Sequence, residues 1–500
     1  MSAAPVINAP CGPVRGVTRP GSFAFLGIPF AEAPVDDLRF AAPVPKAPWS
    51  EVFDATEYGA TPQRRSPFLV STIPEPVIAG TDTLNLNVFT PTLAEHAELP
   101  VHVYIHGGGY IGGSHVGAWF DGATYNRDGV IVVTISYRLG FEGFGWIADA
   151  PRNRGLLDMV CALEWVRDNI RAFGGDPAKV TIAGQSAGGG AVLALLSMPK
   201  ASGLFRGVIA HSPVIGIASV AEHESRGRDF AARLGVQPTV AAWSAVSEDA
   251  VLDAQFAMMK EGDPTHPMAG NMKSTVTAVG EVSMGWGPAL DAETFPVAPW
   301  TAWRDGLNRD VRVVVGATRD EFIFPPAAPT AEVARAWLVA SGLPQPLIDF
   351  GIARIEAGDP DPLGRLATAI MFRLNVLDTA DIRTEAGGRA WIYDFAQPSA
   401  LNGMAMHCLE LPFTWNCLQA EGAETVLGPG APQELADEMH AAWVRFMQTG
   451  DPGWPQYDAG LAGALFGGAT TSSAGGAERT AFDDVRELHA AYSKARGVTA

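Results

Sequence analysis

The chain has 500 residues and a formal net charge of −19 at pH 7, with 35 basic and 54 acidic side chains. Phosphate binding requires a clustered excess of lysine and arginine, so this balance argues against a nucleic-acid partner and disfavours polyanionic substrates. No run approaches the ~20 apolar residues that a membrane helix requires, and the N-terminus lacks the features of a signal peptide. We expect a soluble protein without a membrane partner.

Cysteine is rare in this chain. The four cysteines are Cys11, Cys161, Cys408 and Cys417, and their spacing is not typical of metal ligands. Cys161 falls in a helical pattern, which predicts a small buried side chain. We therefore expect free thiols, a cytoplasmic location and no bound metal.

Short runs rich in valine and isoleucine alternate with helical patterns, which is typical of a mainly parallel sheet covered by helices on both faces. The chain is therefore predicted to have an α/β fold. The predicted strands span Asn85–Phe89, Val101–Ile105, Val130–Tyr137, Val180–Gly184, Val208–Ser212, Arg312–Gly316 and Ala390–Phe395. The predicted helices span Leu156–Phe173, Ala187–Leu196, Ala221–Leu234, Ala331–Ala340, Glu434–Thr449 and Phe482–Ala495.

Two long segments, near residues 236–310 and 325–385, separate strands that should be neighbours in the sheet. We predict one domain over residues 1–500, in which both segments form helical excursions over the top of the sheet and roof a substrate pocket. The stretch Gly460–Gly476 is rich in glycine, alanine, serine and threonine. This composition predicts a surface loop rather than a domain boundary.

The sequence Gly-Gln-Ser-Ala-Gly at residues 184–188 lies between a predicted strand and a predicted helix. It has the form of a nucleophile elbow, a sharp turn that projects a serine hydroxyl, here Ser186, where small neighbours permit a strained backbone. The first N–H groups of the following helix favour developing negative charge at the same place. A chance Gly-x-Ser-x-Gly is the alternative, and the flanking strand and helix argue against it.

A serine nucleophile needs a histidine base and a carboxylate that orients this base, and in this fold type they follow in the order serine, acid, histidine. Three histidines come late enough in the chain, namely His407, His440 and His489. The last two lie in helical patterns, where a surface or packing role is expected. His407 lies in a loop shortly after the last predicted strand, so we select it as the base.

The acid should follow the strand predicted at Arg312–Gly316, and Asp320 and Glu321 lie side by side at that point. Adjacent side chains point in different directions. One carboxylate is therefore predicted to orient the histidine and the other to have a structural partner, for instance Arg319. The local sequence does not show which of these two carboxylates orients the histidine.

An oxyanion hole needs backbone N–H groups that no side chain obstructs. The sequence His-Gly-Gly-Gly-Tyr at residues 106–110 follows a predicted strand directly and offers such groups, and the N–H of Ala187 would be a further donor. A phosphate cradle is the alternative for a glycine-rich loop. Neither a Lys-Ser/Thr pair nor a helix follows directly, which argues against it.

Several large apolar side chains are expected near these motifs and would wall a substrate pocket. They are Tyr110, Trp119, Phe120, Met404, Met406, Phe413 and Trp415. For each of them, a position in the hydrophobic core is the simpler alternative.

Taken together, these motifs resemble the type-B carboxylesterase family, the branch of the α/β-hydrolases that includes bacterial p-nitrobenzyl esterases and the cholinesterases. Similar segments run through most of the chain, at residues 12–16, 25–31, 38–40, 84–88, 137–140 and 172–177. The resemblance implies an α/β-hydrolase fold with a large, mostly parallel sheet. It also implies a serine carboxylesterase that forms an acyl-enzyme without any metal or organic cofactor.

The resemblance also assigns the triad. Ser186 matches the nucleophile, and the family's Arg/Lys-Asp-Glu segment makes Glu321 rather than Asp320 the acid. His407 matches the first residue of the family's His-x-x-Glu-Leu-Pro-Phe.

Further site residues follow from the same resemblance. The implied oxyanion donors are the N–H groups of Gly108, Gly109 and Ala187. Ser212 falls where the family has a serine that bonds the catalytic carboxylate, and Gln185 directly precedes the nucleophile. Both would therefore support the triad from outside it.

Three departures from the family pattern are informative. The family's Glu-Asp-Cys is Thr-Asp-Thr at residues 81–83, so the usual N-terminal disulfide is absent, as in a bacterial cytosolic enzyme. Residues 63–80 contain no tryptophan, which argues against a cholinesterase-style site for quaternary ammonium. Finally, Gln185 stands where the family usually has glutamate, which removes a charge beside the nucleophile.

Gln185, the pair His407-Cys408 and the segment at 318–321 are also similar to a bacterial subgroup that hydrolyses aryl carbamates of the phenmedipham type. We therefore expect a small-molecule ester as substrate, with an aryl carbamate as the alternative, and a monomer or homodimer. A non-catalytic, cholinesterase-like binding protein is the alternative from another class of function. The presence of all three triad residues argues against it.

Overall fold

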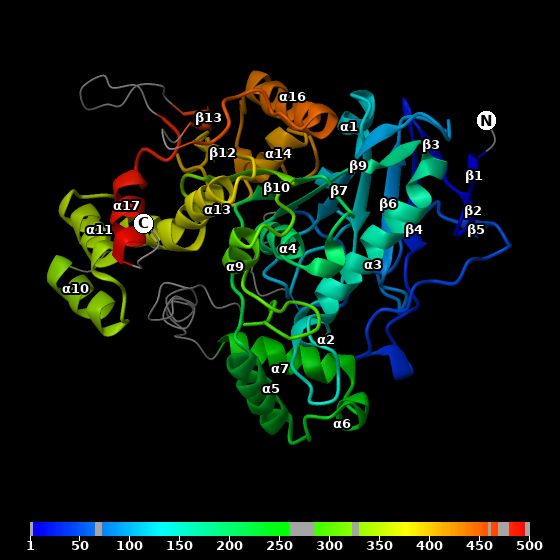
Figure 1. The fold of residues 1–500 in the computed structure, drawn as a ribbon, viewed down its shortest axis with the longest axis horizontal. Helices are drawn as coiled ribbons and strands as arrows, with labels where there is room; N and C mark the ends of the chain where they lie inside the picture. Colours follow the sequence, from blue (N-terminus) through cyan, green and yellow to red (C-terminus); the bar gives the residue numbers. More distant parts are fainter. Residues whose placement is uncertain are drawn as a thin grey trace.

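The computed structural model describes residues 4–65, 73–260, 285–322, 330–458, 462–468 and 480–495. Its main sheet is formed by β3 (Val17–Arg19), β4 (Ser22–Pro29), β6 (Asn85–Thr90), β7 (Leu99–Ile105), β8 (Ile131–Ile135), β9 (Gly175–Gln185), β10 (Gly207–His211), β11 (Arg312–Thr318), β12 (Ala390–Phe395) and β13 (Ala464–Phe466). The strands lie in the order β13-β12-β11-β10-β9-β7-β8-β6-β4-β3, through the centre of the molecule (Figure 1).

The sheet is mostly parallel, as predicted. From β13 to β8 all neighbouring strands run parallel, whereas β6, β4 and β3 form antiparallel pairs at the other edge. The carboxyl ends of parallel strands meet at one edge of a sheet, where open α/β folds bind their ligands. A second, small sheet contains β1 (Val6–Ala9), β2 (Gly12–Arg15) and β5 (Phe53–Asp54).

Alternate residues of each central strand enter two different hydrophobic clusters, one on each face of the sheet. In β7, for example, Val101, Val103 and Ile105 belong to one cluster, and Tyr104 belongs to the other. These strands are buried on both faces, which explains why they form continuous apolar runs in the sequence.

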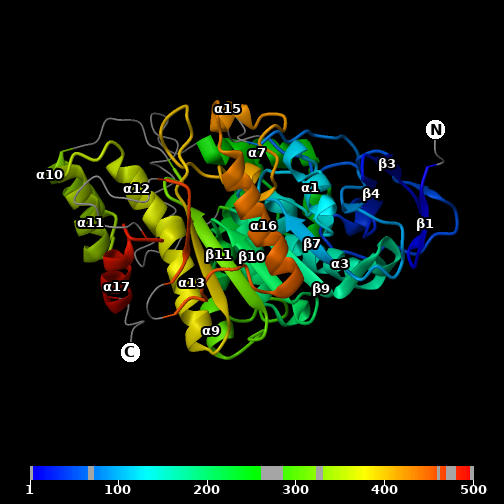
Figure 2. The same ribbon diagram turned by 90° about the horizontal axis from the view of Figure 1, so that it is seen from above.

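Helices cover both faces. They are α1 (Ala123–Arg127), α2 (Gly140–Phe144), α3 (Arg154–Asn169), α4 (Ala187–Leu196), α5 (Val220–Leu234), α6 (Val240–Ser244), α7 (Glu248–Lys260), α9 (Pro299–Arg304), α10 (Ala331–Ala340), α11 (Gln345–Glu356), α12 (Pro362–Thr368), α13 (Leu374–Glu385), α14 (Leu411–Thr414), α15 (Glu424–Leu427), α16 (Gln433–Thr449) and α17 (Arg486–Ala495). α3, α4 and α13 pack on one face, and α16 lies across the other (Figure 2). None of these described helices has the length and apolar character needed to span a membrane.

All seven predicted strands are present, and the helices predicted at Ala187–Leu196 and Ala331–Ala340 have the predicted bounds. The sequence patterns did not predict the N-terminal strands β1 to β5. The loop predicted at Gly460–Gly476 was wrong in part, because β13 lies inside it and extends the sheet next to β12. Residues 460–461 and 469–476 of this prediction lie outside the described residues.

The two long segments near 236–310 and 325–385 are helical where they are described, since they contain α6, α7 and α9, and α10 to α13. α13 does not lie over the top of the sheet. It packs against β11 and β12 and therefore flanks the sheet, whereas α10 and α11 lie farther out beside α17 (Figure 1). Residues 261–284 and 323–329 of these segments lie outside the described residues.

All four cysteines are free thiols, as expected, and three of them, Cys11, Cys161 and Cys408, are buried. Burial raises the pKa of the Cys11 and Cys161 thiols to about 12. These two side chains therefore act as small apolar core groups rather than as nucleophiles.

Candidate active site

Ser186 is the single residue between the end of β9 at Gln185 and the start of α4 at Ala187. Its backbone has φ 59° and ψ −120°, a conformation that residues other than glycine rarely adopt. A Cβ atom on Gly184 would lie 2.3 Å from the carbonyl oxygen of Gly188, and one on Gly188 would lie 2.2 Å from the carbonyl oxygen of Ile105, so both positions require glycine. This strained strand-to-helix turn has the geometry of a nucleophile elbow.

Glu321 lies just beyond the end of β11 and is buried. Its Oε1 accepts a hydrogen bond from the Thr318 backbone N–H at 2.9 Å, and its Oε2 lies 2.5 Å from Nδ1 of His407. The backbone N–H of His407 also donates to the carbonyl oxygen of Glu321 at 3.0 Å. The structure thus joins Glu321, and not Asp320, to the imidazole.

The imidazole of His407 packs against two aromatic rings, which also contact each other at a centroid distance of 5.3 Å. The ring centroids of Phe322 and Phe372 lie 5.3 Å and 5.0 Å from that of His407. Phe322 follows the acid directly, and Phe372 belongs to a π-helical turn (Ala369–Arg373) between α12 and α13. Sequence reasoning missed both rings, because nothing local to either phenylalanine indicates that it packs on a histidine far away in the chain.

Gln185 contacts the other nitrogen of the imidazole. Its side-chain Nε2 lies 3.1 Å from Nε2 of His407. Because Glu321 accepts the proton on Nδ1, Nε2 of His407 is the free acceptor and the Gln185 amide is the donor. The Ser186 hydroxyl makes no hydrogen bond within the described part of the chain. The Gln185 amide is therefore bonded to Nε2 of His407, the nitrogen that would accept the proton of the serine hydroxyl.

The glycine-rich loop after β7 lies directly against the elbow. A Cβ atom on Gly107 would lie 2.6 Å from the Gln185 carbonyl oxygen and 3.2 Å from Cβ of Ser186. Gly108 and Gly109 have φ values of 99° and 64°, which favour glycine. Their N–H groups donate no hydrogen bond to any residue that the structure describes. Gly107 therefore provides the close approach of the loop to the elbow, and the next two residues carry N–H groups without a partner among the described residues.

The chain was compared with known proteins. The model of the carboxylesterase family matches residues 3–333, a range that includes Ser186 and Glu321. A para-nitrobenzyl esterase of Bacillus subtilis (strain 168) is 31% identical over 478 residues, which cover 90% of this chain and 92% of that protein. A phenmedipham hydrolase of Pseudarthrobacter oxydans is 32% identical over 484 residues, which cover 92% and 94%. The chain belongs to the carboxylesterase family.

Solved structures agree with this assignment. A PNB esterase structure has a TM-score of 0.77 at 30% identity, over 91% of this chain and 94% of that one. A Geobacillus stearothermophilus carboxylesterase, solved at pH 6.2, has a TM-score of 0.77 at 30% identity, over 92% and 96% of the two chains. The protein is therefore a carboxylic ester hydrolase with the α/β-hydrolase fold.

Asp320, the second carboxylate of the pair in this carboxylesterase, has a structural role. Its Oδ2 accepts a hydrogen bond from the Ala405 N–H at 2.9 Å, and its Oδ1 forms an ion pair with Arg365. The partner suggested from the sequence, Arg319, was wrong. The Arg319 side chain points toward β12 instead and pairs with Asp394 at 2.8 Å.

The other two late histidines of the carboxylesterase, His440 and His489, bond residues away from the triad. His440 lies in α16 and bonds Thr414 and Asp128, and His489 lies in α17 and bonds Asp378. Both histidines therefore hold their helices against the rest of the protein, as expected. His106 and His211, which lie close to the elbow, are buried, and burial lowers the pKa of each to about 3. Both remain neutral at ordinary pH.

Ser212 is buried beside the elbow with φ 43°. Its backbone N–H donates to the Gly316 carbonyl oxygen at 2.7 Å, but its hydroxyl has no hydrogen-bond partner among the described residues. The bond to Glu321 that the resemblance implies is not formed among the described residues, where the two Glu321 oxygens bond the Thr318 N–H and His407.

A second buried carboxyl group, Glu410, follows His407 closely in the chain. It is fully buried, and neither of its oxygens has a hydrogen-bond partner in the described part of the structure. Burial, with a smaller contribution from the Glu321 charge, raises the pKa of Glu410 well above its ordinary value. Burial therefore favours the neutral form of this carboxyl group.

Most of the large side chains expected near the pocket belong to the core. Trp119, Phe120, Phe413 and Trp415 are buried in the cluster on the α16 face, and Tyr110 is buried on the other face beside Phe144 at a centroid distance of 4.8 Å. Only Met404 and Met406 of the set are partly exposed. The core alternative is thus correct for the five aromatic residues.

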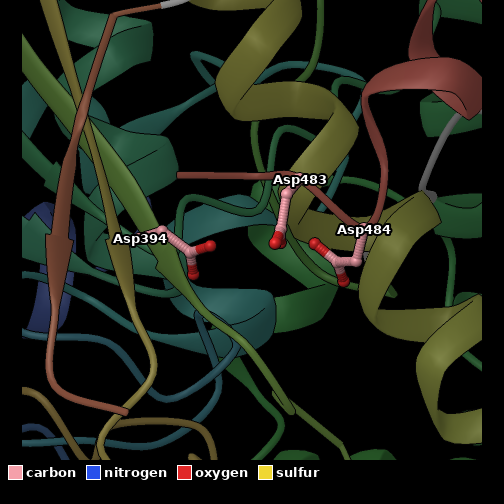
Figure 3. Close-up of side chains that lie close together, drawn as sticks. All are labelled: Asp394, Asp483 and Asp484. Atoms are coloured by element: carbon pink, nitrogen blue, oxygen red, sulfur yellow. The ribbon is translucent and has the colours of Figure 1, made fainter. Parts of the chain in front are cut away.

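Three carboxylates, Asp394, Asp483 and Asp484, point toward one another at the end of β12 (Figure 3). Arg373 pairs with Asp394 at 2.9 Å and with Asp484 at 2.7 Å. Arg319 pairs with Asp394 at 2.8 Å and with Asp483 at 3.2 Å. Each of the three carboxylates is thus already paired with a guanidinium group. A metal cation would have to displace these partners, so the cluster is an ion-pair network.

This network predicts a large loss of stability for Asp394→Asn. Burial acts to raise the pKa of Asp394, but Arg373 and Arg319 outweigh it and hold that pKa well below its ordinary value. Breaking a buried pair typically costs about 3–5 kcal/mol, because uncompensated charges remain. The free energy of unfolding in guanidinium should fall by that amount at pH 7.

The pH dependence provides the control for this prediction. A carboxylate with a lowered pKa contributes stability above its ordinary pKa and loses it as the pH falls. The difference in the free energy of unfolding between wild type and Asp394→Asn should therefore become smaller below about pH 4. A loss that does not depend on pH would contradict the ion-pair explanation.

Proposed function

We propose that Ser186, His407 and Glu321 form the catalytic triad of this carboxylesterase and that it hydrolyses small-molecule carboxylic esters through an acyl-enzyme. The observation that supports this most strongly is the 2.5 Å contact between Glu321 Oε2 and His407 Nδ1, formed next to the elbow that carries Ser186. No further chemical group is needed for this reaction.

In the proposed reaction, the imidazole first exchanges the Gln185 amide for the Ser186 hydroxyl at Nε2. Oγ of Ser186 then attacks the ester carbonyl carbon while His407 takes the hydroxyl proton, and Glu321 stabilises the imidazolium. The N–H groups of Gly108, Gly109 and Ala187 would bind the carbonyl oxygen as it becomes negative. The proton passes to the departing alkoxide, which leaves as the alcohol.

The second half of the reaction repeats these steps with water. His407 takes a proton from water, the resulting hydroxide attacks the acyl-enzyme carbonyl, and the same oxyanion donors hold the oxygen. Collapse of this intermediate breaks the bond to Oγ, and the proton on the imidazole returns to Ser186. The products are a carboxylic acid and the free enzyme.

An aryl carbamate is the second candidate substrate, and the relative that is a phenmedipham hydrolase supports it. A panel of p-nitrophenyl esters from C2 to C12, assayed alongside phenmedipham, tests the choice. We expect the higher kcat/KM with an ester. A higher kcat/KM with phenmedipham would assign the enzyme to carbamate hydrolysis.

We also propose that residues 1–500 form one domain and that the enzyme works in the cytoplasm. One sheet extends from β3 near the N-terminus to β13 near the C-terminus, which supports a single domain. The four free thiols fit a reducing compartment.

The oxyanion loop can be tested by Gly108→Ala. A Cβ atom there would lie 2.3 Å from the Gly112 carbonyl carbon, so the loop must shift and misplace its N–H groups. Loss of one oxyanion donor typically lowers kcat about 10²–10³-fold. Gly129→Ala is the matched control, since Gly129 also has a positive φ, 77°, but open space around its Cβ position. An unchanged kcat in Gly108→Ala would contradict the proposed role of the loop.

The contact between Gln185 and His407 predicts the pH profile of Gln185→Glu. A carboxylate at this position would stabilise the imidazolium, by roughly 4 kcal/mol at ~4 Å and an effective dielectric of ~20 before screening. The base must be neutral to act, so the acidic limb of kcat/KM should move to higher pH by about half a unit or more. The profile is measured with a substrate that does not ionise.

Gln185→Leu is the control for this experiment, because it removes the amide without adding charge. Its acidic limb should not show the upward shift of Gln185→Glu. Coincident limbs in Gln185→Glu and wild type would show that residue 185 does not act on the base electrostatically.

A further inference from the structure

The short helix α12 forms the surface on which the acid loop, residues 320–322, rests. A Cβ atom on Gly364 would lie 2.5 Å from the Phe322 carbonyl oxygen, so helix and loop are in direct contact. The Phe322 N–H also donates to the hydroxyl of Thr368 at 3.4 Å. These contacts place part of the segment 325–385 beside the catalytic acid, not above it.

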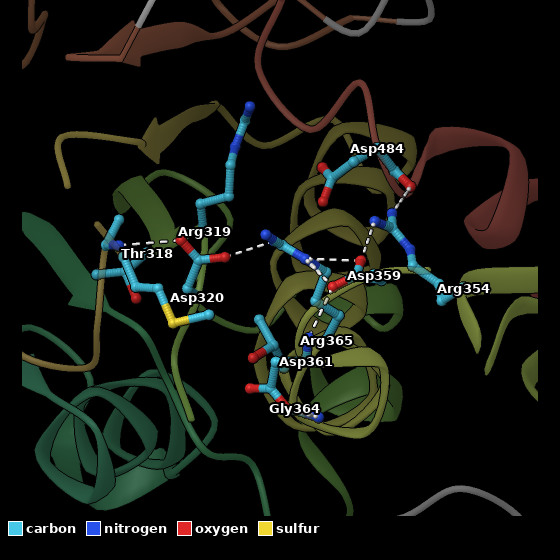
Figure 4. A network of polar contacts seen from close by, with 12 residues as sticks. Thr318, Arg319, Asp320, Arg354, Asp359, Asp361, Gly364, Arg365 and Asp484 are labelled. Carbon is cyan, nitrogen blue, oxygen red and sulfur yellow. Dashed lines mark hydrogen bonds and ion pairs between the residues drawn. The ribbon is translucent and has the colours of Figure 1, made fainter. Parts of the chain in front are cut away.

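Arg365 of α12 lies between two aspartates, Asp320 and Asp359 (Figure 4). One end of its guanidinium forms an ion pair with Asp320, and its Nε lies 3.0 Å from Oδ2 of Asp359. The side chains of Arg365 and Asp320 are only 23% and 11% exposed, so water screens their pair less than a pair on the surface.

Asp320 connects Arg365 to the loop that carries the base. Its carboxylate accepts the Ala405 N–H at 2.9 Å, and its own N–H donates to the Ala405 carbonyl oxygen at 2.9 Å. Two residues later, the His407 N–H donates to the Glu321 carbonyl oxygen at 3.0 Å. These three bonds pair the acid loop with the base loop in a fixed register.

We propose that Arg365 is a positioning residue of this esterase, which fixes the Asp320 carboxylate and thereby holds His407 in register with Glu321. The inference rests on the proposed triad. Without Arg365, the Asp320 carboxylate can turn toward water, and the clamp on Ala405 is lost. A displacement of about 1 Å in a catalytic group can lower the rate about 10²-fold.

The variants that test this inference are Arg365→Gln, Arg365→Lys and Arg354→Gln. Arg354→Gln is the matched control, because Arg354 also pairs with Asp359, at 3.2 Å, but does not touch Asp320. Active sites are counted by stoichiometric labelling of the serine with a fluorophosphonate, and kcat is expressed per labelled site with p-nitrophenyl butyrate. This count separates a poorly folded preparation from a slow active site.

We expect Arg365→Gln to lower kcat per labelled site about tenfold or more, with KM within about twofold of wild type. Arg365→Lys keeps the charge and should recover much of the loss, and Arg354→Gln should remain close to wild type. Asp320→Asn combined with Arg365→Gln should be no slower than the slower single variant, since both act through one clamp.

Other results would overturn the inference. They are an unchanged kcat per labelled site in Arg365→Gln, an equal loss in Arg354→Gln, or a rise in KM alone, which would place Arg365 in substrate binding. If Arg365→Gln does not fold, kcat per labelled site is compared between Arg365→Lys and Asp320→Asn. A higher value in Arg365→Lys would support the inference, and equal values would overturn it. Complete labelling of Ser186 in all variants would still support the proposed nucleophile, so the two proposals fail separately.

Discussion

Ser186→Ala should lower kcat for p-nitrophenyl butyrate by about 10⁶-fold, the size of the loss when the nucleophile of a serine triad is removed. Residual activity should come from the oxyanion donors and from substrate binding alone. The Ser186 hydroxyl has no hydrogen-bond partner in the described structure, so the melting temperature should hardly change. Alanine adopts the same strained turn at a similar cost.

The control is Ser212→Ala, which removes another hydroxyl close to the elbow that has no partner among the described residues. Its kcat should stay far above that of Ser186→Ala. Both variants are compared at equal concentration of folded enzyme, with circular dichroism to check the fold. If Ser186→Ala kept more than about a tenth of the wild-type activity, Ser186 would not be the nucleophile.

Glu321→Gln should lower kcat by roughly 10⁴-fold, as when the acid of a serine triad is replaced by its amide. The amide can no longer stabilise the imidazolium, and its NH₂ group can favour the wrong tautomer at Nδ1, which lies 2.5 Å from the carboxylate in this structure. Steady-state kinetics with p-nitrophenyl esters measure the loss.

Asp320→Asn is the matched control for Glu321→Gln, because the two carboxylates are adjacent and both are buried. Asn can still accept the Ala405 N–H but loses the charge that pairs with Arg365. We therefore expect a loss of about tenfold, far smaller than for Glu321→Gln. The opposite ranking of the two variants would make Asp320 the orienting acid and overturn the assignment.

The central strands and the elbow were predictable from the sequence because their signals are local. A strand that is buried on both faces has a continuous apolar run, and the turn at Ser186 needs small residues at fixed positions. Among the N-terminal strands that were missed, β1, β2, β3 and β5 have only two to four residues, and β1 and β3 are partly exposed. β4 is longer and mostly buried, but a register shift between Phe25 and Ile28 interrupts its pairing. The three residues of β13 lack any such run and depend on pairing with β12.

The choice of His407 as the proposed base also came from the sequence, since its loop position and its order after Ser186 separate it from two helical histidines. The choice between Asp320 and Glu321 was not decided by local reasoning and came from family resemblance. The structure adds the geometric reason. Glu321 faces the imidazole, whereas Asp320 turns to Arg365 on a helix that follows some forty residues later.

By itself, the sequence determined the α/β class, the glycine-rich loop after β7 and the serine turn at residues 184–188, because each depends on neighbours within a few positions. Only the tertiary structure decided which side chains meet: Gln185 contacts Nε2 of His407, Arg365 pairs with Asp320, and the Ser212 hydroxyl has no partner in the described part of the chain. Such contacts join segments far apart in the chain. They are set by how strands and helices pack, and no local pattern of residues encodes that geometry.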